Sequence, residues 1–152
     1  MDSFDKEIIT NTFEDTQKIG EDFAQQLKPG DVVLLYGDLG SGKTTFTQGL
    51  VKGLGIKKRI ISPTFVIVRT YKIATSHQPL AIRKLYHIDL YRTETENDLK
   101  GLGIEEILND KEAIVVVEWP EKLRRMLPRK RWKIHFSYEN ENQRKILIAS
   151  KG

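Results

Sequence analysis

The fold of this chain is decided by the stretch Tyr36-Gly37-Asp38-Leu39-Gly40-Ser41-Gly42-Lys43-Thr44-Thr45, which fits the phosphate-binding P-loop pattern G-x-x-x-x-G-K-[ST]. Its glycines let the backbone turn tightly and bring N–H groups onto an anion. In such a loop the lysine contacts the β- and γ-phosphates, and the hydroxyl of the following residue coordinates Mg²⁺. We therefore predict nucleotide binding by Asp38, Leu39, Gly40, Ser41, Gly42, Lys43, Thr44 and Thr45, with Lys43 also catalytic.

The flanking residues supply the strand and the helix that this motif requires. Residues 31–36 form a short apolar run after Pro29-Gly30, which predicts a buried strand. Apolar residues recur at helical spacing from Thr45 to Leu54, and Gly55 follows as a stop signal. The positive end of that helix dipole would face the phosphates.

Composition places the chain among ordinary globular proteins. Its 152 residues are 39% hydrophobic and 30% charged, which predicts a single domain, residues 1–152, with a proper core. There is no apolar run long enough to span a membrane, no signal-peptide pattern and no cysteine, so we expect a cytoplasmic protein without membrane contact. The net charge of +4 permits an acidic or nucleic-acid partner without requiring one.

Two acidic residues follow apolar strands. Residues 113–117 are five consecutive apolar residues followed by Glu118, the pattern of a central parallel strand that ends in a carboxylate. In P-loop proteins such a residue holds Mg²⁺ or orients the attacking water, so we favour a functional role for Glu118. Asp89 follows the strand predicted over 81–88, a usual place for a site residue. The alternative, a helix N-cap or a surface carboxylate, is equally compatible with the sequence. Trp119 would by default belong to the core, and its position beside Glu118 keeps packing on the nucleotide or on a partner open as the alternative.

A second loop also carries hydroxyl groups. Ser62 and Thr64 flank Pro63, which biases Ser62 to an extended conformation. The segment could sense the γ-phosphate and Mg²⁺, or it could be an ordinary turn. Both interpretations stay open on sequence alone.

The remaining pattern predicts the fold class. Residues 7–10 favour an edge strand, and Thr12 with Asp15 resembles a capping box that opens a helix reaching Leu27. Hydrophobic and turn patterns further predict a hairpin of strands 65–73 and 81–88, two short helices within 93–109, a short helix over 121–127, a strand at 132–136, a turn at 139–142 and a return strand at 144–150. Together they predict a three-layer α/β P-loop NTPase fold whose mostly parallel central sheet carries antiparallel edge strands.

Residues 124–133 hold six basic side chains with no acidic residue between them. Such a stretch can bind nucleic acid or a partner protein. A solvated loop and strand face is the favoured interpretation.

The combined pattern indicates Mg²⁺-dependent phosphoryl transfer. The guanine-specific patterns Asn-Lys-x-Asp and Thr-Lys-x-Asp are missing, which favours ATP. Water is the simplest acceptor, since the sequence shows no acceptor site for a small-molecule kinase. The alternatives are such a kinase and a nucleotide-gated RNA-binding module that uses residues 124–133.

With these motifs in place, the chain resembles the bacterial TsaE family, the small P-loop ATPases of tRNA threonylcarbamoyladenosine biosynthesis, from about Thr12 to Ile148. Beyond the P-loop, the resemblance is carried by Gly53-Leu54-Gly55-Ile56, Ser62-Pro63-Thr64-Phe65, Tyr86-His87-Ile88-Asp89-Leu90-Tyr91-Arg92, Leu102-Gly103-Ile104-Glu105-Glu106 and Val117-Glu118-Trp119-Pro120-Glu121. Two features depart from the family pattern: Ser41 stands where many members have alanine, and the hairpin from Tyr71 to Tyr86 is longer than expected.

The resemblance implies roles for individual residues. Lys43 and Thr44 would bind phosphate and Mg²⁺, and Glu118 would be the Mg²⁺-side carboxylate. Asp89 would be needed for hydrolysis. The first switch would include Thr64 and the second Trp119, and Thr12 would lie near the adenine.

The resemblance also implies partners. TsaE proteins act with TsaD and TsaB, and the implied role is to bind that heterodimer with ATP and to reset it by hydrolysis. Contact with tRNA would be indirect or weak, and the chain would not itself transfer the threonylcarbamoyl group.

Overall fold

The computed structural model describes residues 5–60, 67–73, 82 and 84–151, with only the backbone of Lys151. The predictions made for Ser62, Pro63 and Thr64, and for the connection of the long hairpin, lie outside these residues.

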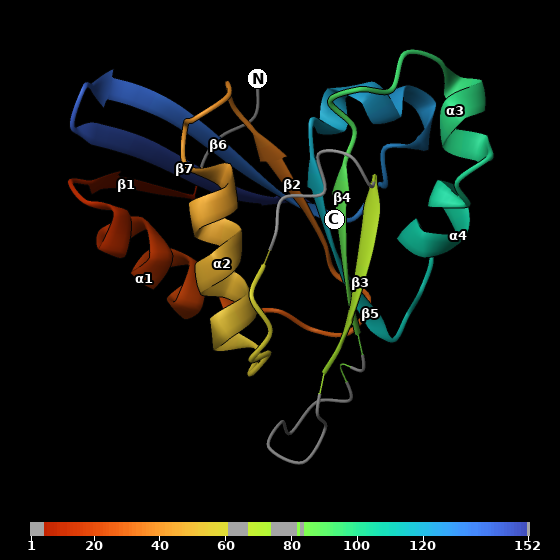
Figure 1. Cartoon of the computed structure of the whole chain (residues 1–152), viewed down its shortest axis with the longest axis horizontal. Coiled ribbons are helices and arrows are strands. Elements are labelled where there is room, and N and C mark those ends of the chain that lie inside the picture. The colour runs from red at the N-terminus through yellow and green to blue at the C-terminus, as the bar shows by residue number, and fades with distance from the viewer. Residues whose placement is uncertain (1–4, 61–66, 74–81, 83, 152) are drawn as a thin grey trace.

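The described strands form one seven-stranded sheet in the order β1-β7-β6-β2-β5-β4-β3 (Figure 1). The four central strands, β6, β2, β5 and β4, pair in parallel, whereas β7, β1 and β3 are added antiparallel at the two sides. This confirms the predicted parallel centre with antiparallel edges. The strands are β1 (Lys6–Thr10), β2 (Val32–Tyr36), β3 (Val68–Lys72), β4 (Lys84–Asp89), β5 (Ala113–Glu118), β6 (Arg131–Asn140) and β7 (Gln143–Lys151).

Helices cover both faces of this sheet, which gives the three layers. Because side chains alternate along a strand, Val33 and Leu35 of β2 join one buried cluster, which packs under α1 and α2, whereas Val32 and Leu34 join a second cluster under α3, α4 and η2. Figure 1 shows α1 and α2 on one side of the sheet and α3 and α4 on the other. The helices are α1 (Phe13–Ala24), α2 (Lys43–Gly53), α3 (Glu96–Lys100), α4 (Ile104–Leu108) and the 3₁₀ segment η2 (Pro120–Met126). Within the described residues, none of the helices is long and apolar enough to cross a membrane.

Several element boundaries differ from prediction. The helix α1 ends at Ala24 rather than near Leu27, which reaches the core from the following turn. The short helix predicted at 121–127 is the 3₁₀ segment η2, kinked at Arg124. The turn predicted at 139–142 is tighter, because Asn140 still pairs with Gln143 across β6 and β7. The two strands therefore continue to a hairpin tip that reaches the functional site.

Glycines allow the backbones of α1 and α2 to pack directly against each other. A Cβ on Gly49 would overlap the carbonyl of Gln17, and a Cβ on Gly20 would overlap the carbonyl of Phe46. This contact fixes α1 beside the P-loop helix, so that the beginning of α1 lies close to the beginning of α2.

Candidate nucleotide-binding site

The P-loop connects the end of β2 to the beginning of α2. Gly40 and Gly42 have φ angles of 76° and 109°, a region that L side chains rarely adopt. Gly42 is the N-cap residue of α2, and its backbone conformation turns the chain into the helix at Lys43. The N-terminal N–H groups of α2 consequently face the loop, as an anion site requires.

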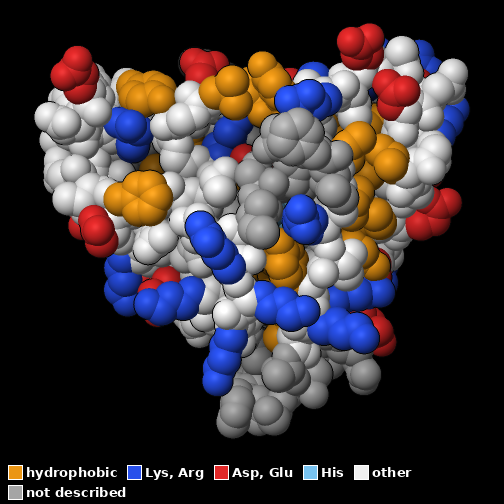
Figure 2. Space-filling view, viewed as in Figure 1, with side chains coloured by type: hydrophobic (Ala, Val, Ile, Leu, Met, Phe, Trp, Pro, Cys, Tyr) orange, Lys and Arg blue, Asp and Glu red, His pale blue; other side chains and the backbone are white. Residues whose placement is uncertain are grey.

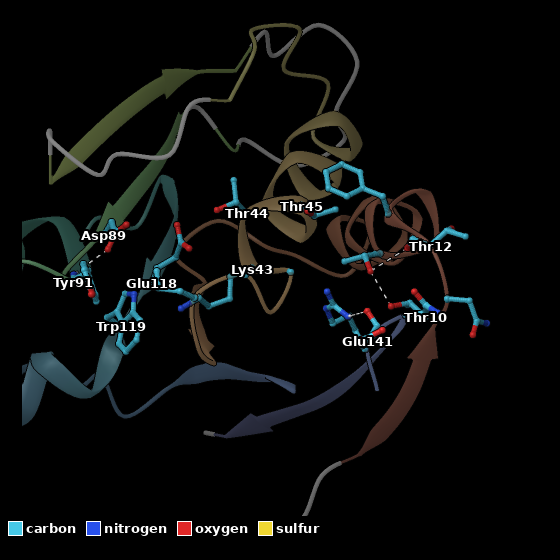
Figure 3. Close-up of a pocket in the computed structure, with 18 residues that line it drawn as sticks. Thr10, Thr12, Lys43, Thr44, Thr45, Asp89, Tyr91, Glu118, Trp119 and Glu141 are labelled. Atoms are coloured by element: carbon cyan, nitrogen blue, oxygen red, sulfur yellow. Dashed lines mark hydrogen bonds between the residues drawn. The ribbon is translucent and has the colours of Figure 1, made fainter. Parts of the chain in front are cut away.

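A cavity of about 610 Å³ opens over this loop (Figure 3). Its wall includes most of the predicted site residues: Thr12, Leu39, Gly40, Gly42, Lys43, Thr44, Thr45, Asp89, Glu118 and Trp119. Eight further residues line it for which the sequence predicted no role in the site: Thr10, Asn11, Phe13, Thr16, Tyr91, Glu141, Asn142 and Arg144. The structure thus brings segments from both ends of the chain to the P-loop.

Two predicted binding residues, Asp38 and Ser41, lie outside the cavity wall. The backbone N–H of Ser41 donates a hydrogen bond to the carbonyl of Asp38 at 3.2 Å. The Ser41 side chain is buried, and a Cβ on Gly37 would approach its Oγ to 2.7 Å. In this structure the two residues shape the turn of the loop and do not face the cavity.

Lys43 is buried at one end of the cavity. Its Nζ donates a hydrogen bond to the carbonyl of Gly37 at 2.5 Å and lies 4.1 Å from the centroid of the Trp119 ring. Burial lowers the pKa of Lys43, while the charges of Glu118 and Asp89 act in the opposite direction. The ammonium group is therefore poorly hydrated and interacts with an aromatic face and two nearby acids.

The two strand-end carboxylates meet across the β4–β5 pair, where Asp89 lies directly opposite Glu118. Both are largely buried, at 9% and 3% exposure. The Oδ1 atom of Asp89 accepts a hydrogen bond from the N–H of Tyr91 at 2.9 Å, and burial raises the pKa of Asp89, with a smaller contribution from the Glu118 charge. The helix N-cap and surface alternatives for Asp89 are wrong, because Thr95 caps the next helix and Asp89 lines the cavity.

Trp119 turns the chain out of β5 with a φ of 59°, a left-handed conformation that is uncommon for a large residue. Its ring lies 5.0 Å from that of Tyr91, centroid to centroid. The Nζ of Lys122 donates to the carbonyls of Tyr91 and Thr93, which ties η2 to the turn after β4. Trp119 thus lines the cavity and also packs, partly buried, against the second core cluster.

The opposite end of the cavity is formed by the beginning of α1 and the β6–β7 hairpin. Thr12 caps α1 by accepting a hydrogen bond from the N–H of Asp15 at 3.0 Å, and the Asp15 carboxylate accepts in return from the N–H of Asn11. The predicted cap is confirmed, with the return bond shifted by one residue. The ring of Phe13 is 61% exposed beside this cap. No local sequence signal places the hairpin here, since contact depends on pairing in the sheet.

One histidine also belongs to the site without lining it. Nε2 of His87 lies 2.7 Å from Oε2 of Glu118, and both side chains are buried. The sequence showed three scattered histidines without metal spacing. The available signal was that His87 precedes Asp89 by two residues on one strand and so shares its face.

Basic residues of 124–133 border two different pockets. Arg124 borders a small pocket beside Thr93 and Lys122, whereas Lys130 and Arg131 border another beside Trp132. Trp132 packs on Phe23 in the core, with centroids 5.1 Å apart. On the face in Figure 2, Lys and Arg side chains are scattered over both the upper and the lower part.

The donor set around Lys43 suits Mg²⁺. The described residues bring together no group of three or more histidine or acidic side chains that could hold a metal ion by themselves. Mg²⁺ is usually held by one or two protein oxygens together with substrate phosphates and water. Thr44 and Glu118, which both line the cavity near Lys43 in Figure 3, fit that mode of binding.

Comparisons with known proteins identify the family of this chain. The model of the family described as threonylcarbamoyl adenosine biosynthesis protein TsaE matches residues 10–146. The chain is 37% identical to the TsaE protein of Bacillus subtilis, over 91% of this chain and 82% of that protein, and 38% identical to that of Rickettsia felis, over 94% and 79%. The crystal structure of Bacillus subtilis YdiB superposes with a TM-score of 0.78 at 31% identity, covering 100% of this chain and 90% of that one. The chain therefore belongs to the TsaE family of tRNA threonylcarbamoyladenosine biosynthesis proteins.

Proposed function

We propose that this chain binds Mg²⁺–ATP and hydrolyses it in support of tRNA threonylcarbamoyladenosine formation. The observation that carries the proposal is the juxtaposition of Lys43, at the beginning of α2, with Asp89 and Glu118 at one end of a cavity lined by the P-loop. Phosphoryl transfer in this class of site depends on positioning and on stabilisation of charge, which these groups supply.

The shape of the cavity supports one orientation for the nucleotide. The phosphates would lie on residues 40–45, where the N–H groups of α2 and the Lys43 ammonium provide positive charge. The base would then point toward Thr12 and Phe13, whose exposed ring offers an apolar face, with Arg144 on the facing hairpin. Tyr138 joins that hairpin to the P-loop, since its hydroxyl donates to the carbonyl of Leu39 at 3.2 Å.

The two carboxylates would have different roles in hydrolysis. Thr44 and Glu118 would hold Mg²⁺, which neutralises charge on the β- and γ-phosphates when it is bound. Asp89 would orient the attacking water or accept its proton, a role suited to a carboxylate whose pKa is raised by burial. Lys43 would leave the Gly37 carbonyl for the phosphates, for which its charge is better suited.

Membership of the TsaE family supports TsaB and TsaD as the partners, in the cytoplasm, with tRNA contacted at most indirectly. Hydrolysis would reset the partner complex between turnovers. The threonylcarbamoyl transfer would remain with the partners.

The test is phosphate release from ATP by the purified chain, alone and with TsaB, TsaD and tRNA. We expect weak release that changes when the partners are added, and that Lys43→Ala abolishes nucleotide binding. Lys52→Ala is the matched control, because Lys52 lies on the same helix with a 77% exposed side chain. ATP affinity unchanged by Lys43→Ala would refute the site, and turnover that requires a small-molecule acceptor would favour the kinase alternative.

A further inference from the structure

His87, which pairs with Glu118, has no role in the hydrolysis proposed above. His87 is fully buried on β4, whereas Glu118 ends β5 and faces the cavity. In the sheet His87 lies opposite Val116, so its side chain emerges on the same face as Glu118, one pleat away. The imidazole lies behind the carboxylate and does not itself line the cavity.

The hydrogen bond fixes the orientation of both groups. A carboxylate oxygen accepts, so Nε2 of His87 carries the hydrogen and donates it to Oε2 over 2.7 Å. Among the described residues, this is the one hydrogen bond that the Glu118 side chain receives, and Nδ1 of His87 has no partner there. The bond therefore ties one carboxylate oxygen back into the sheet and leaves the other for the cavity.

From this geometry we infer that His87 is a positioning residue for ATP hydrolysis, holding the Glu118 carboxylate in the rotamer that presents Oε1 to the metal and phosphate end of the cavity. The inference rests on the proposed function. A glutamate at a strand end has three side-chain torsions, and a buried donor behind it removes that freedom before the nucleotide binds. Groups of this kind behind a metal-side ligand typically contribute about 10- to 100-fold to activity or metal affinity.

The experiment compares two substitutions at His87. In His87→Leu the volume is similar but the donor is lost, whereas in His87→Gln the amide Nε2 can take the place of the imidazole Nε2. We expect His87→Leu to lower the rate of ATP hydrolysis by about 10- to 100-fold and to raise the Mg²⁺ concentration for half-maximal rate. ATP affinity without metal should stay within about threefold, since His87 does not touch the cavity. His87→Gln should recover most of the rate.

Leu85→Ala is the control for lost stability. Leu85 precedes His87 by two residues on the same strand and face, is fully buried, and pairs with Ile114, four residues before Glu118. Its truncation should lower the melting temperature clearly, because it leaves a cavity in the core, yet it should leave hydrolysis near the wild-type rate below that temperature. If His87→Leu behaves like Leu85→Ala, or if His87→Gln is as slow as His87→Leu, the histidine only fills space and the inference is wrong.

A double substitution tests whether His87 acts through Glu118. Glu118→Ala with His87→Leu should be no slower than Glu118→Ala alone, because the group that His87 would position is already gone. Additive losses would overturn the inference. A wild-type chain that hydrolyses no ATP with any partner would instead refute the proposed function.

The tautomer of His87 can be measured by nitrogen NMR on the unmodified chain. This test depends neither on a variant that folds nor on ATP hydrolysis. We expect the Nε2–H tautomer of His87, with a hydrogen that exchanges slowly with solvent. An Nδ1–H tautomer, or rapid exchange, would contradict the hydrogen bond on which the inference rests.

Discussion

The ammonium group of Lys43 lies 4.1 Å above the ring of Trp119, so the lysine of the P-loop motif contacts the residue that follows the strand-end Glu118. Such a cation–π contact is worth about 0.5–2 kcal/mol. In the proposed complex this contact would compete with the phosphates of ATP for the positive charge of Lys43. Nucleotide binding is therefore expected to change the surroundings of Trp119.

Tryptophan fluorescence can follow this change. The chain has two tryptophans, and Trp132 lies against Phe23 away from the cavity. In Trp132→Phe, addition of Mg²⁺–ATP should alter the emission, because Lys43 moves toward the phosphates and leaves the Trp119 ring. In Trp119→Phe the emission should stay constant. An ATP-induced signal that survives Trp119→Phe would show that the contact does not report on the nucleotide.

Asp89→Asn should make the folded chain more stable while it abolishes hydrolysis. The folded-state pKa of Asp89 is raised, mainly by burial, above its value in the unfolded chain. Between the two pKa values the folded chain binds more protons than the unfolded chain, so its stability falls as the pH rises through this range. The free-energy cost of burying the ionised carboxylate is therefore present at neutral pH. The amide removes that charge and can still accept from the N–H of Tyr91. We expect a melting temperature higher by roughly 2–4 °C.

The pH dependence of the stability difference tests whether the charge of Asp89 is its cause. As the pH is lowered through the raised pKa, wild-type Asp89 takes up a proton and the advantage of the asparagine variant should shrink. Thermal unfolding of both proteins over a pH series measures it. A stability difference that does not vary with pH would mean that charge at Asp89 is not its cause.

Phe13→Ala should weaken ATP binding if the base lies against the exposed ring at the beginning of α1. Stacking of a base on an aromatic side chain is worth about 1–3 kcal/mol, so the Kd should rise by roughly 5- to 150-fold. Leu102→Ala is the control, because Leu102 is 39% exposed and does not line the cavity. Isothermal titration with a non-hydrolysable ATP analogue measures both. Equal affinities for wild type and Phe13→Ala would place the base elsewhere.

Gly49→Ala should destabilise the fold strongly. Its methyl group would overlap the carbonyl of Gln17 on α1, and backbone cannot move aside as a side chain can. We expect a loss of about 1–3 kcal/mol or more. Gly101→Ala serves as the comparison, since its Cβ would lie 3.7 Å from the nearest described atom and its φ is −64°. Urea unfolding should show a clear loss for the first variant and little change for the second. Similar midpoints for the two would contradict the tight α1–α2 contact.

The local sequence was sufficient to predict the P-loop and the strand-end carboxylate of the site. A glycine-rich loop between an apolar run and a helical pattern can form only a few conformations, so Lys43 and Thr44 could be placed from their neighbours alone. An apolar run that ends in an acid likewise predicts a carboxylate at a strand end, which the structure confirms for Glu118.

Only the tertiary structure decided which strand ends meet and what closes the cavity. The register of β4 on β5 sets Asp89 opposite Glu118 and brings His87 behind that carboxylate. Sheet pairing likewise carries Arg144 to the same cavity as Phe13, although more than a hundred residues separate them in the chain. These contacts depend on strand order and register, which the hydrophobic pattern of a single strand does not contain.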